Sequence, residues 1–479
     1  MRGSLPAEIG VLSDLKLLDF SSNDLSGNIP SSLGRLAVLE EINLSLNVLR
    51  GTLPPSLFSL SRLSVINIDN NNLRGSIPQV VSSATSLMSL SLNKNRLTGF
   101  VPEWVGQSTT LDTFFASSNE LSGSIPDFSP VASLTRFGVA ANNLAGTIPS
   151  SLFQLLWLRV VLVDNNTLVG TIPPPLKLED ASIETLSASW NSLSGNAEDV
   201  FSTLPALRLK HLDLRGNQFI GSIPPLVGNF TQLTLLRLSD NMLEGSIPTE
   251  IGRLTSLVNV LNLHQNYMSG TIPSEIGALT SLQNLFLSGN IFVGTLPTEI
   301  GRMRRVKFFE VGDNFLNGTI PAEIRNCVSL ENFGIYSNVG VRGDIGVLFN
   351  NLPNSVRVLF LGRINLSGSI PLGVDKFSAM RTLRFQNNNV SGSLPSTIGR
   401  LGVAKDVDVS GNRLKGRIPS EIGGLTRLER LVMRFNRFGM TLPNELSMLS
   451  RLQLLDISEN ELSGSLASLE GLSSLSEFL

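Results

Sequence analysis

One unit of about 24 residues recurs along almost the whole chain. An asparagine marks the same place in successive units, at Asn23, Asn47, Asn71, Asn95, Asn119, Asn142, Asn166, Asn191, Asn217, Asn241, Asn266, Asn290, Asn314, Asn338, Asn388, Asn412, Asn436 and Asn460. Ile364 takes the place between Asn338 and Asn388, which gives about 19 units. One such unit is too short to bury a core alone, so the chain must fold as a stack in which neighbouring units cover each other.

Each half of the unit predicts its own local structure. The unit reads LxxLxxLxLxxNxLxGxIPxxLGxL, as in residues 15–36 and 39–60. The alternation in LxLxx has the period of a β-strand with leucine pointing inward, and neighbouring units would join these strands into one parallel sheet. The asparagine amide both donates and accepts, so a buried column of asparagines can satisfy backbone groups at each bend. The proline fixes φ and ends the pairing, which predicts an irregular or 3₁₀ turn after it.

This unit resembles the leucine-rich repeat of the plant-type class, found in receptor kinase ectodomains, receptor-like proteins and polygalacturonase inhibitors. The resemblance rests on the GxIP half, seen at 27–30, 75–78, 146–149 and 270–273, and covers essentially the whole chain. It implies an α/β repeat solenoid, a horseshoe or superhelix with a parallel β-sheet on its concave face and an irregular or 3₁₀ convex side. We predict a single solenoid domain over residues 1–479, truncated within a repeat at both ends and without caps.

The repeat is broken in three places. Residues 195–198 read GNAE and residues 343–346 read GDIG where the unit should read GxIP. Near Asn436, Gly439 and Met440 stand where a variable residue and the glycine should be. Each break is either drift within a long array or a local bulge beside a binding surface.

Composition excludes several classes of function. The net charge of −2 gives no basic surface for nucleic acid, and no apolar run is long enough to span a bilayer. One cysteine and two histidines leave little for a metal site. We therefore expect no metal, no cofactor, no nucleic acid partner and no membrane-inserted segment in this chain.

The resemblance implies a non-catalytic module that recognises a peptide or protein ligand, as part of a receptor-like kinase or receptor-like protein. Its place would be the extracellular face of the plasma membrane, or it would be secreted. A co-receptor could join near the C-terminal units, and any kinase domain would lie outside this chain. The family's receptors for peptide hormones often carry an Arg-x-Arg pair on the concave face, and no such pair stands in the matching positions here.

The outward positions of the sheet lie six, four and two residues before each asparagine. From about the ninth unit onward they carry charged, hydrogen-bonding and aromatic side chains together, which suits an extended peptide or a protein partner. The candidate ligand-binding residues are His211, Asp213, Arg215, Arg237, Asn262, His264, Phe286, Glu310, Tyr336 and Phe360. The alternative is an ordinary solvated face with scattered aromatic residues.

Two further patterns in the same positions predict no ligand or chemistry. Arg384, Asp406, Asp408, Arg430 and Arg434 alternate in charge between adjacent units, which favours mutual stabilisation over binding. His211, Asp213 and Ser239 could be drawn as a hydrolase trio, but nothing predicts an oxyanion hole or pocket around them. We therefore do not expect an enzyme.

Two other functions share the same repeat. A secreted inhibitor of a cell-wall-degrading enzyme, of the polygalacturonase-inhibitor kind, is the main alternative, although such inhibitors are usually about half this length. An ice-binding protein is the lesser alternative, because serine or threonine fills the x of GxIP in most units. Acceptors for N-glycosylation occur at Asn43, Asn165, Asn229, Asn317, Asn365 and Asn389.

Overall fold

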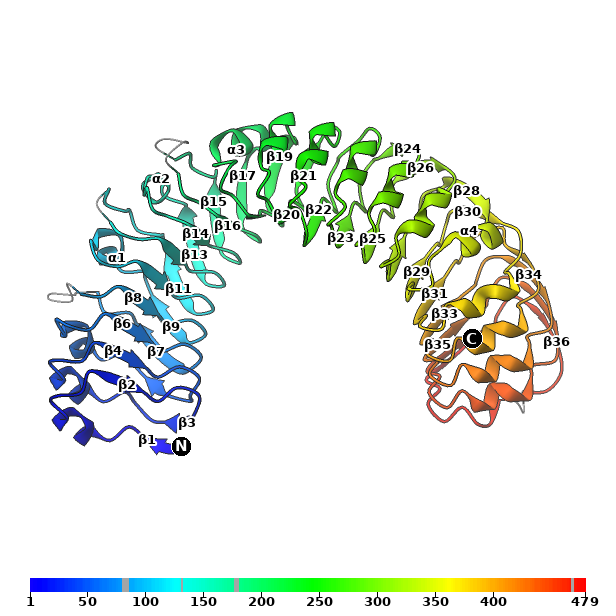
Figure 1. The fold of residues 1–479 in the computed structure, drawn as a ribbon. Coiled ribbons are helices and arrows are strands. Elements are labelled where there is room, and N and C mark those ends of the chain that lie inside the picture. The colour runs from blue at the N-terminus through cyan, green and yellow to red at the C-terminus, as the bar shows by residue number, and fades with distance from the viewer. Residues whose placement is uncertain (80–85, 131, 176–180, 467–468) are drawn as a thin grey trace. The chain divides into compact units, whose positions relative to one another are not determined.

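The computed structural model describes residues 1–79, 86–130, 132–175, 181–466 and 469–479, in two compact units, Met1–Met242 and Leu243–Leu479. Each unit is a run of the same repeats, and the two are described here one at a time (Figure 1). The organisation into one solenoid domain stays a prediction.

A parallel sheet runs through the first unit, with one strand from each repeat. Each residue pairs with the residue in the same place of the next repeat, as Leu18 does with Ile42 and Ile42 with Ile66. The strands are β2 (Leu17–Asp19), β4 (Glu41–Asn43), β6 (Val65–Asn67), β8 (Ser89–Ser91), β10 (Thr113–Phe115), β12 (Arg136–Gly138), β14 (Val160–Leu162), β16 (Thr185–Ser187), β18 (His211–Asp213) and β20 (Leu235–Arg237). The middle residue of each strand points inward and is buried, as the alternation predicts.

The second unit has a sheet of the same kind and register. Phe309 pairs with Phe333, and Leu359 pairs with Leu383. The strands are β22 (Val260–Asn262), β23 (Asn284–Phe286), β25 (Phe308–Glu310), β27 (Asn332–Gly334), β29 (Val358–Phe360), β31 (Thr382–Arg384), β33 (Asp406–Asp408), β35 (Arg430–Val432), β37 (Leu454–Asp456) and β39 (Glu477–Phe478). The predicted fold class, a leucine-rich repeat solenoid built on a parallel sheet, is confirmed.

A second strand follows the asparagine in most repeats. In the first unit these strands are β1 (Arg2–Ser4), β3 (Asp24–Ser26), β5 (Arg50–Gly51), β7 (Asn72–Ser76), β9 (Arg96–Gly99), β11 (Glu120–Gly123), β13 (Asn143–Thr147), β15 (Thr167–Gly170), β17 (Ser192–Asn196) and β19 (Gln218–Ser222), while β21 (Met242–Glu244) lies at the boundary. In the second unit they are β24 (Val293–Gly294), β26 (Phe315–Gly318), β28 (Gly340–Asp344), β30 (Asn365–Ser367), β32 (Ser391–Gly392), β34 (Arg413–Gly416), β36 (Arg437–Met440) and β38 (Glu461–Leu462). The LxG segment therefore also pairs between neighbouring repeats.

Short helices return the chain on the side away from the sheet, mostly as single 3₁₀ turns. The 3₁₀ helices are η1 (Ala7–Val11), η2 (Ser31–Arg35), η3 (Pro55–Ser59), η4 (Pro225–Asn229), η5 (Thr249–Arg253), η6 (Ser274–Ala278), η7 (Thr298–Arg302), η8 (Ala322–Asn326), η9 (Leu372–Lys376), η10 (Ser396–Arg400), η11 (Ser420–Gly424) and η12 (Asn444–Met448). The α-helices are α1 (Glu103–Gln107), α2 (Ser150–Phe153), α3 (Ala197–Thr203) and α4 (Ile345–Asn351). A proline stands just before each of the 3₁₀ helices, as the GxIP pattern predicts.

Two of the three breaks in the repeat are places where a longer α-helix begins. Asn196 and Asp344 stand where the unit places the residue before isoleucine and proline. The side chain of Asn196 accepts a hydrogen bond from the Glu198 N–H, and that of Asp344 accepts one from the Val347 N–H. The prolines that precede the other helices cannot make such a side-chain capping bond. With this cap, α3 and α4 each extend over seven residues. These breaks are changes of helix type with a local cause.

The asparagine column joins each repeat to the one before it. Asn338 is fully buried, and its side-chain nitrogen donates to the carbonyls of Val311, Ile335 and Tyr336 at 3.0, 3.0 and 3.1 Å. Its side-chain oxygen accepts from the Leu316 N–H at 2.9 Å. Buried backbone groups of two successive repeats are thus satisfied by one amide, as predicted.

Ile364 occupies the asparagine place without leaving the neighbouring backbone unpaired. In the preceding repeat, the Val341 N–H donates to the backbone carbonyl of Asn338 at 3.0 Å, a bond within its own turn. The Ile335 carbonyl already accepts from the Asn338 amide. The apolar Ile364 side chain is therefore buried at no cost in lost hydrogen bonds.

We expect Asn338→Leu to lower the free energy of unfolding by about 2–4 kcal/mol, because it leaves buried backbone groups such as the Leu316 N–H unpaired. Ile364→Leu, in the same place of the next repeat, should cost less than about 1.5 kcal/mol. Chemical denaturation of both variants measures the difference. Equal losses would show that the asparagine hydrogen bonds contribute nothing beyond packing.

The third break puts a side chain where the backbone favours glycine. Met440 has φ +66°, in the place that Gly27, Gly51 and Gly75 fill with φ between +74° and +81°. Its side chain is 66% exposed, so little packing offsets the strain.

We expect Met440→Gly to raise the free energy of unfolding by about 0.5–1 kcal/mol, since relief of strain exceeds the extra entropy of the unfolded chain. Met448, exposed within η12, offers a matched control. Met448→Gly should destabilise the protein, because glycine is unfavourable in a helical turn. Denaturant melts that show both substitutions to be destabilising would contradict the strain at Met440.

Candidate functional site

The open face of each sheet is formed by the outward side chains six, four and two residues before the asparagine. The residue directly before the asparagine borders this face and adopts a left-handed conformation in nearly every repeat, as Asp313 (φ +47°) and Arg363 (φ +56°) do. Every repeat therefore offers four positions in fixed columns, and glycine fills some of them, as at Gly312 and Gly334. What the face can bind depends on which side chains fill them.

Four of the predicted binding residues lie in the first unit. The Asp213 carboxylate is buried and lies 3.3 Å from Arg215 Nε and 3.3 Å from Arg237 Nη1. Burial raises the pKa of the Asp213 carboxyl, and the charges of both arginines act against that rise. His211 is exposed, with Nδ1 3.4 Å from the Thr185 hydroxyl. Asp213 is thus held by arginines rather than by the histidine that a hydrolase trio requires.

Six predicted binding residues lie in the second unit, in two groups. The Asn262 side-chain oxygen accepts a hydrogen bond from the His264 N–H at 3.1 Å. This polar atom is therefore engaged with the backbone at the end of its own strand. Phe286 is half-buried on β23. Burial raises the pKa of the Glu310 carboxyl, and the His264 charge lowers it to a smaller extent.

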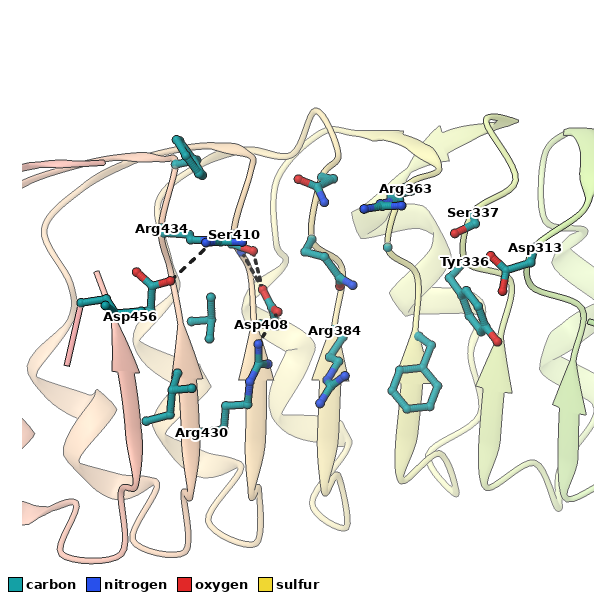
Figure 2. A pocket seen from close by; sticks show the side chains of 18 of the residues that line it. Asp313, Tyr336, Ser337, Arg363, Arg384, Asp408, Ser410, Arg430, Arg434 and Asp456 are labelled. Atoms are coloured by element: carbon teal, nitrogen blue, oxygen red, sulfur yellow. Dashed lines mark hydrogen bonds and ion pairs between the residues drawn. The ribbon is translucent and has the colours of Figure 1, made fainter. Parts of the chain in front are cut away.

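Glu310, Tyr336 and Phe360 belong to a groove of about 730 Å³ on the open face. The rings of Tyr336 and Phe360 meet edge to face, with centroids 6.2 Å apart. The Tyr336 ring lies against the Gly312 backbone, where an added Cβ would come within 2.5 Å of it. Glycine at this position therefore makes room for the ring and fixes where it lies. The groove includes Arg384, Arg430, Arg434 and Asp456 (Figure 2) and continues to Leu479, directly after β39.

The alternating charges predicted to stabilise one another form ion pairs in the structure. Arg384 and Arg430 both bind Asp406, with Arg430 Nη1 3.1 Å from its Oδ1. Arg430 Nη2 also lies 3.1 Å from Asp408 Oδ2. Burial disfavours the Arg430 charge, but the hydrogen bonds that Arg430 donates to these two carboxylates, together with their negative charges, outweigh it and raise the pKa of Arg430. Most of the charge in this half of the groove is therefore neutralised within the protein, as Figure 2 shows for Arg430 and Asp408.

Three charges of the groove stand outside these pairs. Among the ion pairs between described residues, none involves Glu310, Asp313 or Arg363. Burial and the Asp313 and Glu310 carboxylates together raise the pKa of the Tyr336 phenol.

Asp313 and Arg363 were not among the predicted binding residues, because the column directly before the asparagine was not counted as outward. The residue in this column adopts a left-handed conformation whatever its type, so only its position before the asparagine could have identified it from the sequence.

The glycosylation acceptors differ in accessibility. Asn165, Asn229, Asn317 and Asn365 are exposed, and Asn389 is half-buried. Asn43 lies on β4, where its amide accepts from Ser45 and donates to Asp19. Accessibility alone thus favours four of the six.

Metal-binding clusters and membrane-spanning helices are both missing from the part of the chain that the structure describes. No group of three or more histidine, cysteine, aspartate or glutamate side chains in the described ranges could hold a metal ion. No helix in the described ranges is long and apolar enough to cross a bilayer.

Comparison with known proteins gives the same repeat in plant receptors. The family model described as Leucine Rich Repeat matches residues 14–36, 86–108, 208–230, 232–254 and 281–303. Receptor-like protein 39 of Arabidopsis thaliana is 30% identical over 144 residues, which cover 28% of this chain and 16% of that protein. Receptor-like protein 41 of the same plant is 35% identical over 127 residues, 25% of this chain and 14% of that protein.

Solved ectodomains match over the full chain. The ectodomain of the Arabidopsis thaliana receptor kinase GASSHO1/SCHENGEN3, solved in complex with CASPARIAN STRIP INTEGRITY FACTOR 2, is 30% identical with a TM-score of 0.82 and covers 100% of this chain and 60% of that one. The HAESA ectodomain from Arabidopsis, in complex with an IDA peptide hormone, is 29% identical with a TM-score of 0.77 and covers 100% of this chain and 80% of that one.

We expect Asp406→Asn to lower the free energy of unfolding by about 1–2 kcal/mol, because it leaves Arg384 and Arg430 without a shared carboxylate of which 15% is exposed. Asp375→Asn removes the Arg400 pair, in which the arginine is 73% exposed, and should cost less than about 0.5 kcal/mol. Urea denaturation at low and high salt compares the two. A loss at Asp406 no larger than that at Asp375 would contradict the network.

Proposed function

We propose that this chain, a plant-type leucine-rich repeat protein, is a non-catalytic recognition module that binds an extended peptide in the groove of its second unit. The observation that carries the proposal is the combination of paired aromatic rings and uncommitted charges within one groove. Tyr336 and Phe360 supply apolar area, while Glu310, Asp313 and Arg363 supply charges outside the protein's own ion pairs. Such a mixture is typical of interface centres.

The dimensions of the groove suit a short peptide lying across the strands. Its lining residues come from eight successive repeats, from that of β25 to that of β39. At a spacing of about 4.8 Å, seven intervals span roughly 34 Å, which an extended chain of about ten residues would cover. The framework is held by the asparagine column, so little ordering is required on binding.

The charges suggest how the peptide would be oriented. Glu310 and Asp313 form an acidic end that suits a basic side chain or the peptide amino group. The edge-to-face rings of Tyr336 and Phe360 suit an apolar or aromatic side chain between the two ends. Arg363, two repeats beyond Asp313, suits an acidic side chain.

This site begins later in the chain than the surface predicted from the columns, at β25 instead of β18. It keeps Glu310, Tyr336 and Phe360 and adds Asp313 and Arg363. We do not assign His211, Asp213, Arg215, Arg237, Asn262, His264 or Phe286 to this groove, because its lining does not include them. Their role in ligand binding stays a prediction.

The setting proposed for the module is the extracellular part of a plant receptor. The similar proteins are receptor-like proteins and receptor kinase ectodomains, and the HAESA ectodomain has also been solved with a peptide hormone and the co-receptor SERK1. By analogy, a co-receptor would complete the complex of this chain with its peptide. A secreted inhibitor of a wall-degrading enzyme is less well supported, because the receptors match over the full chain.

Peptides selected on the full chain from a phage-displayed library of random linear peptides test the site. We expect Phe360→Ala and Arg363→Glu to weaken binding of the selected peptides at least about tenfold, as loss of an interface anchor does. Phe286→Ala is the matched control, since Phe286 is another half-buried aromatic residue on the same sheet face but outside the groove lining. Isothermal titration gives the affinities. Binding that resists Phe360→Ala but is lost in Phe286→Ala would move the site toward β23.

A further inference from the structure

Five exposed apolar side chains follow one another along an edge of the second unit, outside the groove. They come from four successive repeats. The residues and their exposed fractions are Tyr267 (61%), Ile291 (43%), Val293 (43%), Phe315 (61%) and Val339 (68%). Val293 on β24 pairs directly with Phe315 on β26, and β24, β26 and β28 are neighbours in one small sheet (Figure 1). We call these five residues the apolar strip. Val293 and Phe315 therefore lie side by side, and exposed apolar side chains that gather on neighbouring repeats usually have something that covers them.

A glycosylation acceptor stands within the apolar strip. Residues 315–319 read Phe-Leu-Asn-Gly-Thr, so Asn317 lies two residues after Phe315 on β26. Alternation along a strand places the two side chains on one face, and the burial of Leu316 between them confirms it. Asn317 and Thr319 are both exposed, and Gly318 turns the chain with φ +73°. The acceptor amide is therefore accessible beside an exposed aromatic ring.

Asn317 differs in this respect from the other five acceptors. The residues two places before them are Glu41, Val163, Val227, Arg363 and Asn387. None of these is aromatic, and both valines are fully buried. Within this chain, only the acceptor in the apolar strip has an aromatic side chain at that offset.

We propose that Asn317 carries an N-linked glycan that covers the apolar strip. Its first N-acetylglucosamine packs on the Phe315 ring, and the sugars that follow extend over the rest of the strip. One face of that sugar presents only C–H groups, which make favourable contacts with the face of an aromatic ring, while its hydroxyls stay in water. The donor would be the lipid-diphosphate-linked oligosaccharide of the secretory pathway. The Asn317 side-chain nitrogen bonds to the anomeric carbon and loses a proton, and the lipid diphosphate leaves.

The glycan is a better occupant for the strip than a protein. A sugar chain on Asn317 would stand beside Phe315 and obstruct a flat approach to the strip by another surface. The inference rests on the proposed extracellular setting, because only a secreted chain meets the donor. It makes Phe315 a positioning residue for the glycan and leaves the groove unaffected, since no strip residue lines it.

The full chain, secreted from eukaryotic cells, tests the proposal in two measurements. Glycopeptide mass spectrometry should find Asn317 occupied, and Phe315→Ser should lower that occupancy. Asn317→Gln should lower the melting temperature by about 1–3 °C. Asn229→Gln is the matched control, because Asn229 is exposed at the end of η4 and the residue two places before it is the buried Val227 rather than an aromatic residue. It should shift the melting temperature less.

Trimming separates the first sugar from the rest of the glycan. An endoglycosidase that leaves one N-acetylglucosamine should preserve the melting temperature, whereas an amidase that removes the whole glycan should lower it. The effects of Phe315→Ser and Asn317→Gln on melting temperature should not add, since both remove the same contact.

Several outcomes would overturn the proposal. An unmodified Asn317 in a chain glycosylated elsewhere removes it and leaves the proposed function intact. A chain without any glycan would also contradict the extracellular setting. Equal shifts for Asn317→Gln and Asn229→Gln would show that the ring makes no contact with the sugar. Dimers of the secreted chain that dissociate on Phe315→Ser would assign the strip to a second copy instead.

Discussion

The hydrogen bonds of the buried asparagine column hold every other feature of this protein in place. Each amide ties the turn at the end of one strand to the backbone of the preceding repeat, as Asn338 does with Leu316 and Val311. Because these groups are buried, leaving them unpaired would cost more than the bonds themselves contribute. The column thereby sets both the register of the sheet and the left-handed residue before each asparagine. Ile364 is the exception to this pattern. In the repeat before it, the Val341 N–H already donates to the Asn338 carbonyl, so no side-chain amide is required at position 364.

Because the register of the sheet is fixed, the ligand that the open face can bind depends on which side chains occupy its outward columns. Where opposite charges fall on adjacent strands, as with Arg384, Asp406 and Arg430, they bind each other and leave little charge for a ligand. Where the neighbours are uncharged or aromatic, the charges stay uncommitted, as with Asp313 and Arg363 beside Tyr336. In one half of the groove, the charges of Arg384 and Arg430 are neutralised by ion pairs within the protein. In the other half, Asp313 and Arg363 are outside those ion pairs, so this half is better suited to bind a polar peptide.

Small departures from the repeat have local physical causes rather than one shared function. Asn196 and Asp344 replace the residue before isoleucine and proline, cap a helix, and lengthen the turn that follows. Met440 takes a glycine position and bears its strain in an exposed strand. None of the three lies in the groove lining, so the open face keeps its columns through every break.

The sequence alone determined the fold, because a short repeat with inward leucines and a bending asparagine allows only a stack of parallel strands. It also identified the outward columns, including Glu310, Tyr336 and Phe360. It could not decide which of those residues share a groove, since that depends on how side chains from different repeats fill the space between them. The ring position of Tyr336 depends on Gly312 in the preceding repeat, and the commitment of Arg384 depends on Asp406 in the next one. Such contacts join residues more than 20 positions apart, so only the tertiary structure decided them.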